Sequence, residues 1–241
     1  PFVYAFYSCL LTGFWAVIFL VGLIPPFDAL GVPSLANVQF PTIQVISMAF
    51  LTAYTFFMAL VSMYDALRHS DAAVVMPIIG TISTLATFGL SYLFLDVSLS
   101  QGHIVGIFMI SLGTLLVAKA LPEWSVVLHV VHSGIFFALH YITMKGLFLE
   151  TSFDDGFFWS RISFVLFALS LLMVPVYWDK IKEQTKTTTK KTGVLVLTTK
   201  VLAGVSAFLL LKATDLGDVS VVQALDGVRF VFILHIQFLH M

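Results

Sequence analysis

Long apolar runs separated by short polar stretches dominate the chain. Eight such runs are bounded by proline, glycine or charged residues, and none alternates with the period of two expected of a transmembrane barrel strand. Each run is close to the roughly 20 residues that an α-helix needs to cross the apolar core of a bilayer. The predicted membrane helices cover about 3–24, 44–67, 72–95, 102–120, 125–149, 156–178, 194–213 and 219–240.

Composition agrees with this pattern and narrows the classes of function. The chain is 59% hydrophobic and 10% charged, with a mean hydropathy of +1.02, whereas about a quarter of the residues in a soluble domain are charged. The few charges cluster between the apolar runs, which gives no indication of nucleic-acid binding. The single Cys9 forms no internal disulfide, and no Cys/His pattern predicts a metal site. We therefore expect an all-α, polytopic membrane protein that is surrounded by lipid and needs no cofactor.

A ten-residue echo suggests an internal duplication. Residues 71–80 read Asp-Ala-Ala-Val-Val-Met-Pro-Ile-Ile-Gly, and residues 218–227 read Asp-Val-Ser-Val-Val-Gln-Ala-Leu-Asp-Gly, with four identities. The copies open the third and the eighth predicted helices. An odd number of crossings between equivalent points inverts the second copy, as in secondary transporters. We expect two inverted five-helix repeats, 1–121 and 122–241, with eight of ten helices present and the first and last missing.

Further residues resemble a known family. The run 65–75, Asp-Ala-Leu-Arg-His-Ser-Asp-Ala-Ala-Val-Val, precedes an apolar stretch that closes with Tyr-Leu-Phe-Leu-Asp-Val-Ser-Leu-Ser at 92–100 and glycines at 102, 106 and 113. This pattern resembles EamA-type proteins of the drug/metabolite transporter superfamily, and the half after Trp124 is similar to the second EamA repeat. Many members have Glu-Pro where this chain has Ser83-Thr84, so no role of Glu-Pro carries over. The resemblance implies a central cavity lined by the second, third, fifth, seventh and eighth predicted helices, with transport by alternating access.

The last predicted helix carries the main candidate site. Asp226 and Arg229 lie near its middle, where ionisable side chains are costly unless they are paired or functional. Their spacing of three makes them neighbours on one helix face, with Gln223 one turn earlier. Two interpretations stay open: a mutual ion pair that is only structural, or a polar cavity face on which Asp226 exchanges a proton or Arg229 holds an anion.

The fifth predicted helix contains His129, His132, Ser133, Phe136 and His140, whose spacing predicts one stripe facing protein or water. Histidine titrates near neutral pH, so proton coupling is one hypothesis. The favoured interpretation is that these histidines are neutral and form hydrogen bonds between helices. Metal binding by the first two histidines is less favoured, because no acidic or cysteine partner is adjacent.

Other polar residues within the predicted helices have two interpretations each. Lys200 fits an edge or a cavity equally well, whereas Arg161 fits an edge better because its long stem can reach the surface. Tyr54 and Thr81 could contact a substrate, although bonding within or between helices is the default for such hydroxyls. The predicted substrate or proton site comprises Asp226, Arg229, Gln223, His132, His140, Lys200, Tyr54 and Thr81.

Two surface features concern packing and orientation. Gly102 and Gly106 form a face of small residues, for which packing within the fold is favoured over a homodimer. The lysine-rich loop 179–193 predicts a cytoplasmic location for that end, because short basic loops stay inside. The usual arrangement of the resembled family would place the same loop outside, so the orientation stays open.

The function expected from these features is that of a multi-pass carrier in the plasma membrane, exporting or importing a small organic metabolite, with proton coupling left open. No nucleophile, acid-base pair or metal cluster is evident near one interface, so an enzyme is not expected. The alternative is a structural or sensory multispanning protein. Such a protein would tolerate the loss of its midplane charges.

Overall fold

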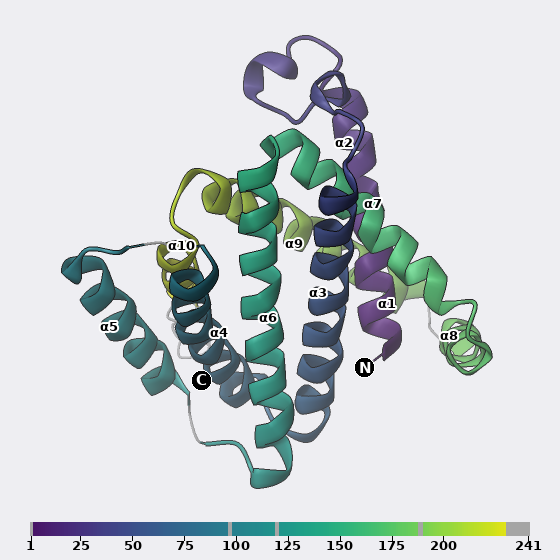
Figure 1. The fold of residues 1–241 in the computed structure, drawn as a ribbon. Helices are drawn as coiled ribbons and strands as arrows, with labels where there is room; N and C mark the ends of the chain where they lie inside the picture. The colour runs from purple at the N-terminus through teal and green to yellow at the C-terminus, as the bar shows by residue number, and fades with distance from the viewer. Residues whose placement is uncertain (1, 96–97, 119–120, 188–189, 230–241) are drawn as a thin grey trace.

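The computed structural model describes residues 2–95, 98–118, 121–187 and 190–229, and every regular element in these ranges is helical (Figure 1). Short 3-10 turns are labelled η. The elements in chain order are α1 (Phe2–Leu11), η1 (Thr12–Phe14), α2 (Trp15–Val21), η2 (Asp28–Leu30), η3 (Leu35–Asn37), α3 (Ile43–His69), α4 (Ala72–Phe94), α5 (Gln101–Val117), α6 (Trp124–Glu150), α7 (Phe153–Leu171), α8 (Pro175–Thr187), α9 (Lys190–Leu216) and α10 (Val219–Asp226).

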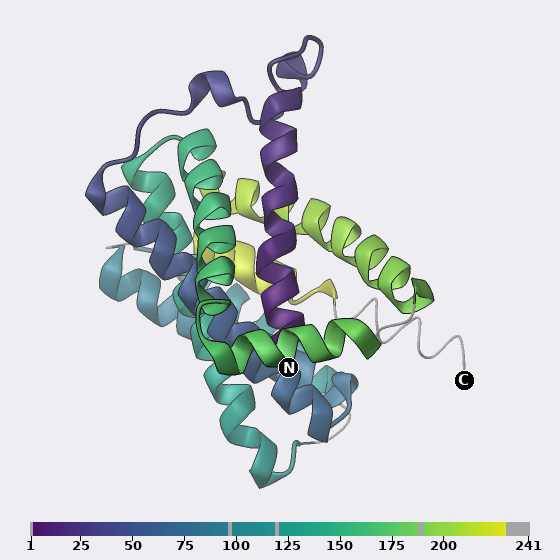
Figure 2. The same cartoon turned by 90° about the vertical axis from the view of Figure 1, so that its right-hand side faces the viewer.

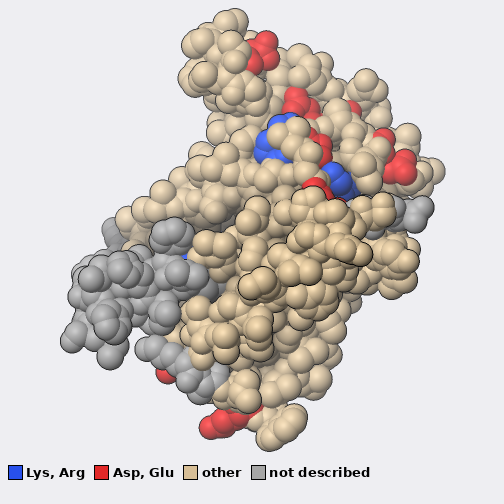
Figure 3. Space-filling model, turned by 90° about the vertical axis from the view of Figure 1, so that its left-hand side faces the viewer, with Lys and Arg blue, Asp and Glu red and all other residues tan. Residues whose placement is uncertain are grey.

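Five of the described helices are long and apolar enough to cross a membrane: Phe2–Val21, Ile43–His69, Ala72–Phe94, Trp124–Glu150 and Gly193–Leu216. A sixth crossing is obtained if α7 and α8 count as one bent span. On the face seen in Figure 3, charged residues lie toward the upper end and at the lower end, while most of the middle carries none. The chain is thus an all-helical protein with the apolar helices of a membrane-embedded one. The prediction of eight crossings stays a prediction, because α5 is short and most of 219–240 lies outside the described residues.

The predicted sixth helix, 156–178, is wrong at its end. Helix α7 stops at Leu171, and α8 starts at Pro175 after a bend of 97°. Proline lacks a backbone N–H and disfavours a helical conformation in the residue before it, but it fits the first turn of a new helix. The stretch 179–193 is also not a loop, because α8 continues to Thr187 and α9 begins at Lys190. Figure 2 shows α8 lying across the lower end of α1.

Helix α6 occupies the centre of the bundle, between α3 and α4 (Figure 1). The Ser133 hydroxyl donates a hydrogen bond of 3.0 Å to the Ala59 carbonyl of α3. On the α4 side, a Cβ added at Gly134 would lie 2.6 Å from Cγ2 of Ile82. Because α6 presents small residues to both neighbours, the three helices approach closely.

Both copies of the echo begin a helix. Asp71 directly precedes α4 and Asp218 directly precedes α10, each with an extended backbone. Only Asp218 uses its side chain as a cap, accepting hydrogen bonds from two backbone N–H groups of the first turn of α10. The expected change from polar turn to apolar helix is therefore present at both positions.

Helices α4 and α10 pack side by side in opposite directions. The Thr84 hydroxyl donates to the Gln223 carbonyl at 3.2 Å, and the hydroxyls of Ser91 and Ser220 share a hydrogen bond of 2.7 Å. Later residues of α4 thus meet earlier residues of α10. The two copies of the echo run antiparallel, whereas the complete repeats and the division at residue 121 stay predictions.

The segment between α2 and α3 is held against the start of α7. Asp154 Oδ2 accepts hydrogen bonds from the backbone N–H of Ser34 and from Asn37 Nδ2. Asp155 Oδ1 accepts one from the backbone N–H of Gln39. These carboxylates at the N-terminus of α7 also fit the sign of its helix dipole. They fix the position of α7 and of the residues that it presents to the interior.

The glycine face of α5 makes no close contact inside the described fold. A Cβ at Gly106 or Gly113 would meet nothing within 4 Å, and at Gly102 only Ser100 Oγ at 3.9 Å. The predicted internal packing role of Gly102 and Gly106 is therefore wrong for the described part of the chain. A homodimer through this face stays a prediction.

We expect Gly134→Ala to lower the free energy of unfolding by about 2 kcal/mol, because overpacking a tight helix contact forces its neighbours apart. Thermal unfolding of the purified protein in detergent measures the change. Gly113→Ala is the matched control, since its Cβ meets open space and alanine favours the helix. Equal stability of the two variants would contradict the close approach of α4 and α6.

Candidate functional site

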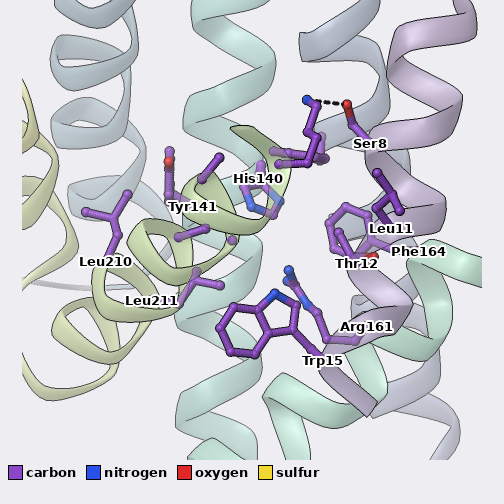
Figure 4. A pocket seen from close by; sticks show the side chains of 15 residues that line it. Ser8, Leu11, Thr12, Trp15, His140, Tyr141, Arg161, Phe164, Leu210 and Leu211 are labelled. Atoms are coloured by element: carbon purple, nitrogen blue, oxygen red, sulfur yellow. Dashed lines mark hydrogen bonds between the residues drawn. The ribbon is translucent and has the colours of Figure 1, made fainter. Parts of the chain in front are cut away.

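A cavity of about 140 Å³ lies inside the bundle (Figure 4). It is bordered by the first span (Phe2–Val21) and by α3, α6, α7 and α9. Its walls are largely apolar, with Trp15, Phe56 and Phe164 as the aromatic members. We call it the cationic cavity because Arg161 and Lys200 line it. The polar side chains that line it are Ser8, Thr12, His140, Tyr141, Arg161 and Lys200.

Arg161 lies deep in this cavity. Arg161 is only 5% exposed. The central carbon of its guanidinium lies 4.9 Å from the ring centroid of Phe157 and 4.5 Å from that of Phe164. Nε and Nη2 are each 3.4 Å from Ser160 Oγ, which is long for a hydrogen bond. No described Asp or Glu forms an ion pair with Arg161. The predicted edge position of Arg161 is wrong, because this face of α7 is covered by neighbouring helices.

Lys200 reaches the same cavity from α9. Its Nζ donates hydrogen bonds to Ser8 Oγ at 2.7 Å and to the Tyr64 hydroxyl at 3.1 Å. Figure 4 draws the bond to Ser8 on the wall opposite Trp15. Of the two positions that the sequence left open for Lys200, the structure shows the cavity. Both described partners of its ammonium group are neutral hydroxyls.

His140 stands on the α6 wall of the cationic cavity. Its Nδ1 lies 3.1 Å from the Thr52 carbonyl and donates to it, because a carbonyl oxygen only accepts. This bond between α6 and α3 agrees with the structural interpretation of the histidine. In Figure 4, His140 and Arg161 point toward the same space from different helices.

A second cavity of about 140 Å³ lies on the other side of α6, toward α4 and α10. Asp226 Oδ2 and Arg229 Nη1 form an ion pair of 2.9 Å on its wall. Gln223 also lines it, together with Ser83, whose buried Oγ has no hydrogen-bond partner in the described part of the chain. We call this the paired cavity. The predicted ion pair is present, and both of its residues line this cavity.

Helix α10 ends earlier than the sequence suggested. Its last residue is Asp226, and residues 227 and 228 form a turn before Arg229. A continuous helix over the whole of 219–240 is therefore wrong. The carboxylate and the guanidinium, three residues apart, contact each other across this turn.

Tyr141 is common to the two cavities. It lines both, next to His140 on α6, with the two rings 5.2 Å apart. The cavities are therefore adjacent compartments on either side of one side chain. Both lie along the same central helix.

Two predicted histidine positions lie elsewhere. His132 is exposed on the surface of the described residues, with its ring 6.5 Å from that of Phe136. His129 Nε2 lies 3.1 Å from Asp65 Oδ2, near the end of α3. The predicted common stripe is wrong for His132. The reason is that one residue turns a helix by about 100°, so His132 diverges from the buried Ser133.

Tyr54 and Thr81 also lie outside both cavities. Tyr54 is exposed and packs edge-on against Phe136 and Phe167. The Thr81 hydroxyl is buried and donates to the carbonyls of Pro77 and Ser111, at 3.0 and 3.3 Å. The default interpretation of Thr81, bonding within and between helices, describes these contacts.

Besides Arg161, the cavity residues that sequence reasoning missed include Ser8, Thr12, Trp15 and Tyr141. Ser8 and Thr12 carried a usable signal, because a spacing of four places two hydroxyls on one face of an otherwise apolar helix. Tyr141 carried none, since an aromatic residue in a membrane helix is ordinary.

Lys145 controls the position of α9, which forms one wall of the cationic cavity. Its Nζ donates hydrogen bonds of 2.9 to 3.0 Å to the carbonyls of Thr214, Asp215 and Gly217. These carbonyls lie at the C-terminal end of α9, where a cation is favoured by the helix dipole. Lys145 thus ties the end of α9 to α6.

Comparison of the chain with protein-family models found no match, and comparison with curated protein sequences found none either. The geometry of the two cavities therefore carries the functional argument.

We expect Arg161→Met to raise the free energy of unfolding by about 1 kcal/mol, because it removes a buried cation that has no described carboxylate partner. Lys145→Met is the contrasting control. It leaves three carbonyls without their donor and should lower stability by about 2 kcal/mol. Unfolding in detergent, without added ligand, measures both. Strong destabilisation by Arg161→Met would indicate a structural cation.

Proposed function

We propose that the chain belongs to a secondary carrier of the EamA type, located in the plasma membrane, that exports or imports a small organic metabolite by alternating access. The observation that carries this proposal is the cationic cavity inside an apolar bundle. Ionisable groups at membrane depth cost free energy, and they commonly mark a pathway for a solute or an ion. Arg161 and Lys200 meet that description, with only hydroxyls and aromatic rings as described partners.

The arrangement of helices around the two cavities supports the carrier proposal. The five predicted lining segments correspond to α3, α4, α6, α9 and α10, and each contributes to at least one cavity. The first span and α7 complete the cationic cavity. The antiparallel contact of α4 with α10 supports inverted repeats as the architecture of the proposed carrier.

Charge at the two ends of the bundle supports a defined orientation. Glu150, Asp154 and Asp155 lie at the end where α6 meets α7, and α8, which carries Lys180 and Lys182, follows the opposite end of α7. Short basic segments favour the cytoplasmic side. We therefore assign the end that carries α8 to the cytoplasm.

Helix α9 is the element best placed to move. Large apolar residues on its outer side are exposed, and Figure 2 shows it running outward from the bundle. Its inner side borders the cationic cavity with Ala203, Gly204 and Ala207. A shift of α9 would open or close this cavity without disturbing the contact of α6 with α3.

The competing proposal is a structural or sensory membrane protein, and the Asp226–Arg229 pair is what favours it. An ion pair that only neutralises its own charges needs no ligand. Position on a cavity wall favours the carrier instead, because a solute that enters the paired cavity meets both charges.

We expect Gly204→Val to reduce solute uptake into proteoliposomes at least tenfold without loss of folded protein. A Cβ at Gly204 already lies 3.3 Å from Trp15 Nε1, so a larger side chain would fill the cationic cavity. Uptake of a panel of radiolabelled metabolites by wild-type protein identifies the solute to be measured. Gly193→Val is the matched control on the same helix, since its Cβ meets nothing within 4 Å. No saturable uptake by wild-type protein, or equal uptake by both variants, would count against the carrier.

Exchange of the paired charges separates a structural role from a functional one. The double variant Asp226→Arg with Arg229→Asp keeps both charges adjacent, so thermal stability should stay near that of wild type, while Asp226→Asn alone should lower it by about 1 kcal/mol. We expect the exchanged protein to lose most of its uptake activity, because the field in the paired cavity is reversed. Full uptake with restored stability would assign the pair to structure alone.

A further inference from the structure

We propose that the cationic cavity binds the carboxylate or phosphate group of an organic anion, with Arg161 and Lys200 as its charged contacts. This inference rests on the proposed carrier function and names its class of substrate. The site predicted from the sequence centred on Asp226 and Arg229 and included Lys200, but it did not include Arg161.

The charge balance of the cationic cavity favours an anion. The cationic cavity contains two basic side chains and no acidic one. Described ion pairs bind Asp65, Asp215 and Asp226 to other basic groups, none of which lines this cavity. A cation in apolar surroundings is costly until an opposite charge neutralises it. An entering anion would supply that charge.

The hydrogen-bond donors of the two cations also favour an anion. A guanidinium has five N–H donors, and the described contacts of Arg161 engage Ser160 at the long distance of 3.4 Å. Its planar fork matches the two oxygens of a carboxylate or phosphate. The Lys200 ammonium has three donors, of which Ser8 and Tyr64 accept two. Donors therefore remain on both cations for an anionic oxygen.

Two aromatic rings hold the guanidinium of Arg161 in place. The rings of Phe157 and Phe164 lie against its guanidinium and leave it no described carboxylate to turn toward. Aromatic faces attract a cation yet provide no hydrogen-bond acceptor. The group is fixed in place while its N–H donors stay available, which is the arrangement expected of a preorganised anion site.

The walls indicate the rest of the ligand. Leu11, Trp15, Phe56 and Leu211 present apolar surface to the same cavity of about 140 Å³. That combination fits a compact anion with a short apolar or aromatic body. The paired cavity does not compete for an anion on the same terms, because the carboxylate of Asp226 accompanies its guanidinium.

Binding to the full chain in nanodiscs of neutral phosphatidylcholine tests the proposal. The probes are benzoate and phenyl phosphate, with benzyl alcohol and benzylamine as neutral and cationic counterparts. We expect the two anions to raise the midpoint of thermal unfolding in a saturable manner and the counterparts to leave it unchanged. Absence of a shift with both anions, or an equal shift with benzylamine, would overturn the anion site.

Variants locate the binding. Arg161→Gln and Lys200→Gln should each weaken anion binding at least tenfold, and Arg161→Lys should recover part of the loss. Lys212→Gln is the matched control, because Lys212 pairs with Asp215 outside the cavity. Loss of binding in the control to the same extent would overturn the assignment. If either cavity variant fails to fold, the other one and the partial recovery by Arg161→Lys still decide the result.

Two further experiments are needed. One distinguishes a lipid headgroup from a soluble anion, and the other distinguishes failure of the anion site from failure of the carrier proposal. Nanodiscs that contain phosphatidylglycerol test a lipid headgroup, and stabilisation by this lipid alone, with no response to soluble anions, would overturn a solute site. Saturable uptake of an uncharged or cationic solute, together with no anion binding, would overturn this inference but leave the carrier standing. Anion binding without any uptake would remove the carrier and keep the site.

Discussion

The close contact of α6 with α3 and α4 is the constraint on which the rest of the structure depends. Inside a bilayer, helices gain little from apolar burial against one another, so tight packing and hydrogen bonds between helices hold them together. Gly134 permits the approach to α4, while Ser133 and His140 bond to backbone carbonyls of α3. The same helix presents His140 and Tyr141 to the cavities. His140 therefore belongs both to the contact with α3 and to the wall of the cationic cavity.

The two cavities are similar in size and opposite in electrostatic character. One contains a carboxylate and a guanidinium in contact, so its charges largely cancel. The other holds two cations whose described partners are all neutral. Tyr141 lines both cavities. Its ring therefore separates the cavity whose charges are paired from the cavity whose cations have no described acidic partner. The described charges therefore make the cationic cavity the more positive of the two.

Sequence reasoning succeeded for features that depend on position along the chain. It failed for features that depend on which helices pack against a given face. Apolar runs gave the positions of most helices because burial in lipid depends on composition along the chain, and the echo located the residues before α4 and α10. The bend at Pro175 was readable from the proline, but the apolar run continued past it. The burial of Arg161 could not be predicted from the sequence. The position of a residue along a helix does not show which neighbouring helices cover its side of the helix. His132 was misplaced for the same reason, since one residue changes the direction of a side chain by about 100°.

The cap that Lys145 places on α9 has a mechanical consequence. A rigid helix held at one end acts as a lever, and Lys200 lies about 20 Å along α9 from the capped carbonyl of Thr214. A tilt of about 10° at the cap would move Lys200 by roughly 4 Å, given that length. That displacement exceeds the 2.7 Å which separates its Nζ from Ser8. A small rotation at the cap would therefore be enough to break or restore the contact of Lys200 with Ser8.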